Sequence, residues 1–86
     1  MPEISHFLGI TIRMYFNDHL PPHFHAIYNE YTAEISVETL EVIAGRLPHR
    51  VLSLVIEWAI FHRGELRRNW GLARQQQTLQ PIQPLE

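Results

Sequence analysis

The sequence predicts an α+β fold, in which an antiparallel meander of three to four strands is followed by two helices packed on one face of the sheet. Two observations support this prediction: apolar and polar residues alternate through the first half, and a nearly continuous apolar run fills residues 51–61. With 86 residues, 45% hydrophobic and 19% charged, the chain is large enough for one compact core but not for two. We therefore expect a single domain over residues 1–86.

Three segments of the first half have the period of two that is typical of strands. Residues 7–16 place their apolar side chains on one side, and residues 23–29 and 31–38 alternate in the same way. Asn29-Glu30 between the last two segments predicts a tight turn. A short fourth strand over residues 39–44 would complete a meander within residues 1–44.

The second half is predicted to be helical over residues 48–76. Pro48 suits a first helical position, and residues 49–62 are apolar around most of the helix circumference, which is typical of a central or interfacial helix. Gly64 is expected to bend this helix or to separate it from a second helix. Residues 77–86 predict an extended tail, and the sequence leaves open whether it docks.

Charge and composition restrict the function. The net charge of −2 argues against a uniformly basic nucleic-acid binder, although six of the seven basic residues follow residue 42 and all seven are arginine. The chain has no cysteine, which excludes disulfides and thiolate metal sites. The first residues lack the pattern of a secretory signal, and no apolar run reaches the roughly 20 residues of a membrane span. We expect a cytoplasmic protein.

The most reactive chemistry is predicted in the segment Pro21-Pro22-His23-Phe24-His25. On a strand, His23 and His25 project from one face, and antiparallel pairing would add Arg13 and Tyr15 to that face. With a carboxylate that Glu34 of the third strand would supply, such a group suits phosphodiester cleavage without a metal or other cofactor. The two histidines would serve as acid and base, Arg13 would hold the phosphate and Tyr15 would orient it.

Two other interpretations of these histidines stay open. They are structural surface residues or contact a partner, or they bind a metal ion whose shell is completed by carboxylates and which recruits His19 from the preceding loop. Asp18 is expected to cap the turn.

A second candidate surface lies on the predicted second helix. Its members are arginines with one tryptophan, residue types that are enriched where proteins bind partners: Arg67, Arg68, Trp70 and Arg74. Two interpretations stay open. These residues form a docking surface for an acidic partner or an RNA backbone, or the arginines form a solvated face and the Trp70 ring lies in the core.

Several segments together resemble a family of small bacterial proteins, the domain-of-unknown-function family 4160. They are Met1-Pro2-Glu3-Ile4-Ser5, Gly9-Ile10, Ile12-Arg13-Met14-Tyr15, Pro21-Pro22-His23-Phe24-His25, Leu47-Pro48 and Glu57-Trp58-Ala59. The resemblance implies a small stand-alone gene, often beside another small gene in an arrangement similar to a toxin–antitoxin pair.

Two functions follow as hypotheses. In the first, the chain is one component of a toxin–antitoxin-like module, a toxin that acts on RNA by metal-independent histidine chemistry and is paired with the small protein of a neighbouring gene. In the second, the chain is a non-enzymatic protein-binding module whose histidines are structural. A homodimer is compatible with both, and the sequence does not decide whether the chain is an enzyme.

Overall fold

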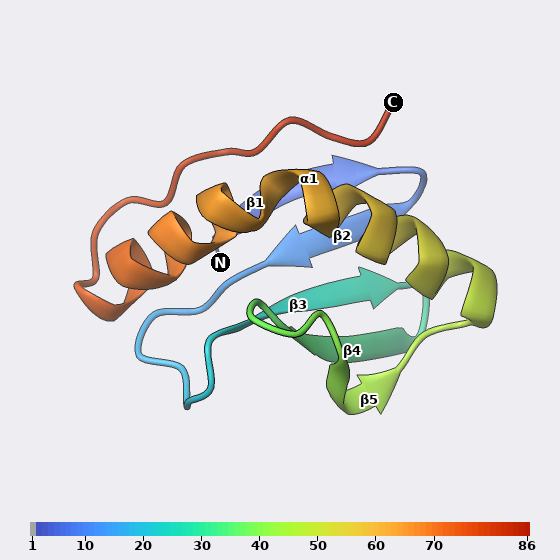
Figure 1. Ribbon diagram of the computed structural model, residues 1–86, viewed down its shortest axis with the longest axis horizontal. Helices are drawn as coiled ribbons and strands as arrows, with labels where there is room; N and C mark the ends of the chain where they lie inside the picture. Colours follow the sequence, from blue (N-terminus) through green and yellow to red (C-terminus); the bar gives the residue numbers. More distant parts are fainter. Residues whose placement is uncertain (1) are drawn as a thin grey trace.

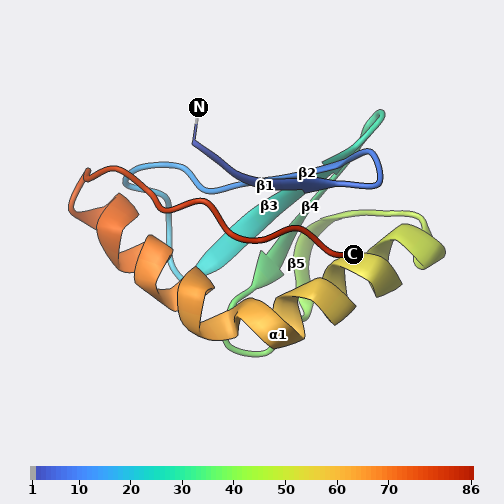
Figure 2. The ribbon, with the colours of Figure 1, turned by 90° about the horizontal axis from the view of Figure 1, so that it is seen from above.

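The computed structural model describes residues 2–86 and has an α+β architecture, in which one long helix covers one face of an antiparallel sheet (Figures 1 and 2). The sheet has the order β1-β2-β3-β4-β5, so every strand pairs with the next one along the chain. The elements are β1 (Glu3–Phe7), β2 (Ile10–Arg13), β3 (His23–Tyr28), β4 (Tyr31–Ser36), β5 (Val42–Arg46) and α1 (His49–Arg74).

The meander has five strands rather than three or four. The segment 7–16, predicted as one strand, is interrupted by a turn at Leu8 and Gly9, whose φ angles are +52° and +79°. Strand β1 precedes this turn and pairs with β2. The apolar Leu8 concealed the turn, because residues with positive φ are usually glycine or asparagine. Phe16, expected on the apolar side of the strand, lies beyond β2 and is 45% exposed.

The core lies between the sheet and α1. Trp58 is fully buried, and its ring lies 5.4 Å from the ring of Phe7 and 6.0 Å from that of Phe24. The inward side chains of the sheet follow the predicted alternation, with Ile10, Ile12, Phe24, Ala26, Ala33 and Ile35 all buried, and Met14 just beyond β2 is buried as well.

A single helix replaces the two predicted helices. Its backbone departs from helical geometry at His62, with φ −125° and ψ 19°, and continues helically through Gly64. The His62 Nδ1 atom lies 2.5 Å from a carboxylate oxygen of Glu65, which bridges the two sides of this kink. Pro48 was predicted as the first helical residue, but it is the N-cap, and the helix begins one position later at His49.

The helix is not central, which was one of the two predicted alternatives, and its apolar residues do not all lie in the core. Val51, Val55 and Trp58 point into the core, whereas Ile60 and Phe61 are 59% and 76% exposed. Over residues 2–86, no helix has the length and apolar character required to cross a membrane.

The tail is extended, as predicted, and it docks beside β1 and α1 (Figures 1 and 2). Ile82 is 4% exposed, so the tail contributes an apolar side chain to the core. Three contacts hold it: the Ile82 N–H donates to Ile4 O at 2.7 Å, Trp58 Nε1 donates to Gln83 O at 2.8 Å, and Asn69 bonds the backbone of Gln80.

Candidate functional site

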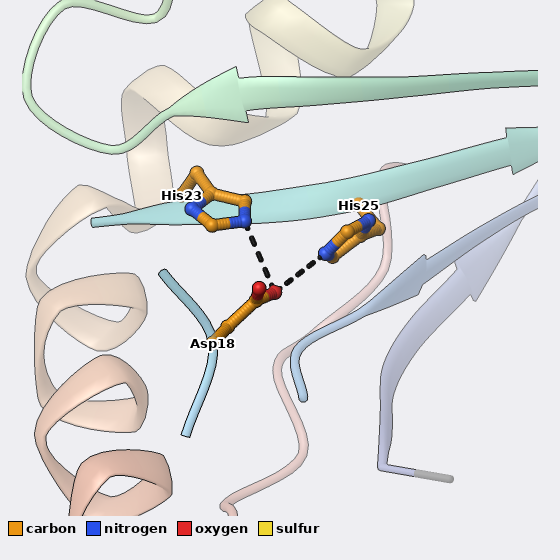
Figure 3. Close-up of side chains that lie close together, drawn as sticks. All are labelled: Asp18, His23 and His25. Carbon is orange, nitrogen blue, oxygen red and sulfur yellow. Dashed lines mark hydrogen bonds and ion pairs between the residues drawn. The ribbon is translucent and has the colours of Figure 1, made fainter. Parts of the chain in front are cut away.

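The segment that carries the two histidines forms a compact polar site at the start of β3. The loop between β2 and β3 folds back so that Asp18 reaches the two imidazoles (Figure 3). His23 and His25 are two residues apart on β3 and therefore point to the same side, as predicted. A loop carboxylate thus lies between two strand histidines.

One oxygen of Asp18 contacts both rings. His25 Nε2 donates a hydrogen bond to Asp18 Oδ2 at 2.8 Å, and His23 Nε2 lies 3.0 Å from the same oxygen (Figure 3). The two imidazoles meet edge to face, with ring centres 5.1 Å apart. Asp18 was predicted to cap the turn, and it does bond the His19 N–H at 2.9 Å, but its second oxygen organises the site.

His23 is fully buried, although the strand pattern predicted that it lies on an exposed face of the sheet. Its ring is stacked on that of His19 at 4.7 Å and lies 5.3 Å from the ring of Trp70, which α1 supplies. His23 Nδ1 donates to Pro21 O at 2.7 Å. The contact between His23 Nε2 and Asp18 Oδ2 lacks hydrogen-bond geometry. This buried nitrogen therefore has no hydrogen-bond partner among the described residues.

The Asp18 carboxylate is stabilised in its ionised form. Desolvation by burial acts to raise the pKa of Asp18, but the hydrogen bonds from His25 and from the His19 backbone N–H, together with the electrostatic effect of the two strand histidines, lower it below its ordinary value of 3.8. At neutral pH the site therefore contains a fixed negative charge.

Arg13 and Tyr15 lie beside His25, as predicted. Arg13 is directly opposite His25 in the β2–β3 pairing, and directly opposed residues share a face. The Arg13 Nε atom is buried without a hydrogen-bond partner, and within residues 2–86 the guanidinium forms no ion pair. The Tyr15 ring packs edge-on against that of His25 at 4.5 Å. The structure therefore brings the four predicted residues together, and their catalytic roles stay predictions.

A second group of polar atoms adjoins the first and shares His23. Glu34 is opposite His25 on β4, and its Oε1 lies 3.3 Å from His19 Nε2 and 3.5 Å from His23 Nε2. His19 has a side chain that is 63% exposed, so it lines the solvent side of the site. The prediction for His19 was a surface residue of the loop that a metal site at the histidine pair would recruit. Its position in the loop, four residues before His23, was the only available signal.

The arginines of the predicted partner surface have different surroundings in the structure. Arg67 donates to both oxygens of Glu38, at 3.1 and 3.3 Å. Trp70 is 8% exposed and belongs to the core, while the Arg74 guanidinium lies 6.0 Å from its ring. Arg68 is exposed. Partner binding by these residues stays a prediction.

Comparison with known proteins places the chain in a family. A family model described as a domain of unknown function, DUF4160, matches residues 9–71, which is more than half of the chain. The chain belongs to the DUF4160 family. The matched residues of this DUF4160 protein include Asp18, His23, His25 and Glu34, and thus the whole polar site. No curated protein and no solved structure matches the chain.

Proposed function

We propose that this DUF4160 protein cleaves RNA by histidine acid–base chemistry, as the toxin of a two-protein toxin–antitoxin-like module. The observation that carries the proposal is the hydrogen bond between Asp18 and His25, which lies beside the unpaired guanidinium of Arg13. A histidine fixed by a carboxylate provides a base near neutral pH, and an arginine provides the cation that a phosphate requires.

The hydrogen bond to Asp18 selects one tautomer of His25. Because Nε2 carries the proton that Asp18 accepts, the lone pair of a neutral His25 lies on Nδ1. No described residue makes a hydrogen bond to this Nδ1. A carboxylate that orients an imidazole and stabilises its protonated form is the arrangement that supports a general base in many hydrolytic enzymes. His25 is therefore the proposed base.

RNA is the proposed substrate because it supplies its own nucleophile. His25 would take the proton of a ribose 2′-hydroxyl, the 2′-oxygen would form a bond to the adjacent phosphorus, and the bond from phosphorus to the 5′-oxygen would break. The leaving oxygen takes a proton from water. The planar guanidinium of Arg13 suits two phosphate oxygens at once, and no step requires a metal ion.

The remaining residues have supporting roles in this proposal. The buried ring of His23 is closed to a substrate, so in this proposal it does not act as the acid that the sequence suggested. Tyr15 packs against His25 and orients the phosphate.

Growth of cells that express the protein alone, or together with its gene neighbour, tests this proposal. We expect growth inhibition by the protein alone, relief by the neighbour, and no inhibition by a His25→Gln variant. The control is His6→Gln, because His6 is exposed on β1, bonds only Thr11 and lies outside the site. Full inhibition by a folded His25→Gln variant would contradict the assignment.

A second candidate function is protein binding without catalysis, and the exposed apolar residues of α1 favour it. Ile60 and Phe61 are mostly exposed, and Leu52, Ile56 and Ile60 line a hollow of about 400 Å³ together with His49, Ser53 and Glu57. Exposed apolar patches commonly mark binding surfaces. Under this alternative the module partner binds α1 and the histidines are structural.

Size-exclusion chromatography of the protein mixed with its neighbour's product separates the two candidates. Under the binding alternative, Phe61→Ser or the double variant Arg67→Ser/Arg68→Ser weakens the complex, and growth does not depend on His25. The complex of the His25→Gln variant is the control.

A further inference from the structure

We infer that His19, His23 and Glu34 bind a divalent transition-metal ion, best matched by zinc, which fastens the β2–β3 loop to the sheet. The three residues come from the loop, from β3 and from β4, and their ligand atoms lie within 4.8 Å of one another. This inference goes beyond the proposed cleavage of RNA and does not rest on it.

The free nitrogen of His23 is the first observation behind the site. Donation from Nδ1 to Pro21 O leaves the lone pair of a neutral ring on Nε2. This Nε2 is buried in a side chain that is 0% exposed, has no hydrogen-bond partner, and points toward Asp18 and Glu34, which are acceptors. Buried polar atoms are nearly always satisfied, so a cation between these groups would supply the missing partner. A backbone carbonyl on the other ring nitrogen is the usual support of a metal-binding histidine.

The spacing of the three ligand atoms is the second observation. Zinc binds imidazole nitrogen and carboxylate oxygen at about 2.0–2.2 Å in tetrahedral sites, so neighbouring ligand atoms are separated by roughly 3.3–3.6 Å. The distances from Glu34 Oε1 to the Nε2 atoms of His19 and His23, 3.3 and 3.5 Å, fit this value. The 2.8 Å between Asp18 and His25 is shorter and fits a direct hydrogen bond.

The charge of the site also favours a cation. Asp18 Oδ2 lies 3.0 Å from His23 Nε2, and Asp18 Oδ1 lies 3.8 Å from His19 Nε2, so a second carboxylate adjoins the three ligands. With neutral imidazoles, the two carboxylates outweigh the single positive charge of Arg13. Asp18 is placed to complete a four-ligand shell or to bond a water molecule that does so.

The ligand types restrict the metal. Two imidazoles and one carboxylate suit zinc and similar transition metals, whereas magnesium and calcium prefer oxygen ligands. Because His19 lies in the loop and Glu34 in β4, a bound ion would join the loop that carries Asp18 to the centre of the sheet. The inferred role of the ion is therefore structural.

Isothermal titration of untagged, metal-free protein with zinc chloride tests the inference, with magnesium chloride as the comparison. We expect one zinc ion per chain and no saturable binding of magnesium. His19→Gln and Glu34→Gln should each weaken zinc binding at least tenfold, because each removes one ligand, whereas His6→Gln should not change it. At about a hundredfold excess of zinc over the dissociation constant, the thermal midpoint of the wild type should rise by roughly 10 °C or more.

Three results would overturn the inference. They are the absence of saturable zinc binding, equal zinc affinity in the wild type and in the folded His19→Gln and Glu34→Gln variants, and loss of binding confined to His25→Gln. Since His19 is mostly exposed and glutamine is close in shape to glutamate, circular dichroism should confirm that these variants fold. Zinc binding is measured without RNA and RNA cleavage is measured in EDTA, so failure of either proposal leaves the other testable.

Discussion

Loosening of the C-terminal tail should destabilise the whole domain, and Asn69→Ala removes one of the three contacts that hold the tail. Asn69 lies on α1 and is 1% exposed. Its Nδ2 donates to Gln80 O and its Oδ1 accepts the Gln80 N–H, both at 2.8 Å. The single side chain thus satisfies both backbone groups of one tail residue.

The expected loss in the free energy of unfolding follows from these two hydrogen bonds. Each hydrogen bond contributes about 1 kcal/mol net, and leaving two partly buried backbone groups without a partner adds up to about 2 kcal/mol. We expect Asn69→Ala to lower the free energy of unfolding by roughly 2–4 kcal/mol, a large share of the stability typical of a small domain. For a chain of this length, that loss corresponds to a fall of roughly 10–20 °C in thermal midpoint.

Urea unfolding followed by circular dichroism would measure this change. Gln80→Ala is the matched control, because Gln80 contributes only backbone atoms to the contact and its side chain is exposed. We expect the control to remain within about 0.5 kcal/mol of the wild type. A similarly small effect of Asn69→Ala, or an equal loss in both variants, would refute the reasoning.

Three further predictions concern the sheet, the site and the surface. Gly45→Ala should lower the free energy of unfolding by roughly 1–3 kcal/mol in urea melts, because Gly45 has a φ of +72° and an added Cβ would lie 2.1 Å from Thr32 O; an unchanged melt would contradict this. Because the pKa of Asp18 is lowered on folding, its ionised form stabilises the protein above its ordinary pKa of 3.8, and this contribution disappears as the pH falls through the folded-state pKa. Wild type should therefore lose more stability than Asp18→Asn on acidification, and parallel urea-stability profiles would argue against it. Glu38→Gln should leave the urea midpoint unchanged, since the Arg67–Glu38 pair is exposed; a clear shift would show a larger role for this pair.

The parts of the fold that sequence analysis predicted are those with a regular burial pattern. Strand β2 alternates buried and more exposed residues throughout, and β3 and β4 do so apart from residues at their ends, such as the buried His23 and Ser36, so their period was visible. Strand β1 was missed because a register shift between Glu3 and Ser5 disturbs its pattern and the following turn contains Leu8. The helix was predicted to be interrupted at Gly64, because glycine is a weak helix former. The kink occurs instead at His62, a residue type that gives no such signal.

The site was predicted as far as strand geometry determines it. His25 and Arg13 came together because strand period and antiparallel pairing fix the face on which each lies, whereas Tyr15 lies two residues beyond β2 and packs its ring against that of His25. The contact of Asp18 with the histidines depends on the path of a loop, which residue spacing does not give. The burial of His23 depends on Trp70, which α1 brings from a distant part of the chain.

The rate of RNA cleavage by purified protein in EDTA tests the central proposal most directly. The substrate is a labelled single-stranded RNA, and a DNA of the same sequence serves as the control without a 2′-hydroxyl. We predict that the RNA is cleaved and the DNA is not. The rate of RNA cleavage should be roughly 100- to 10,000-fold lower in a folded His25→Gln variant, because the base is removed. Equal cleavage by His25→Gln and by wild type, or no cleavage of RNA by wild type, would contradict the account.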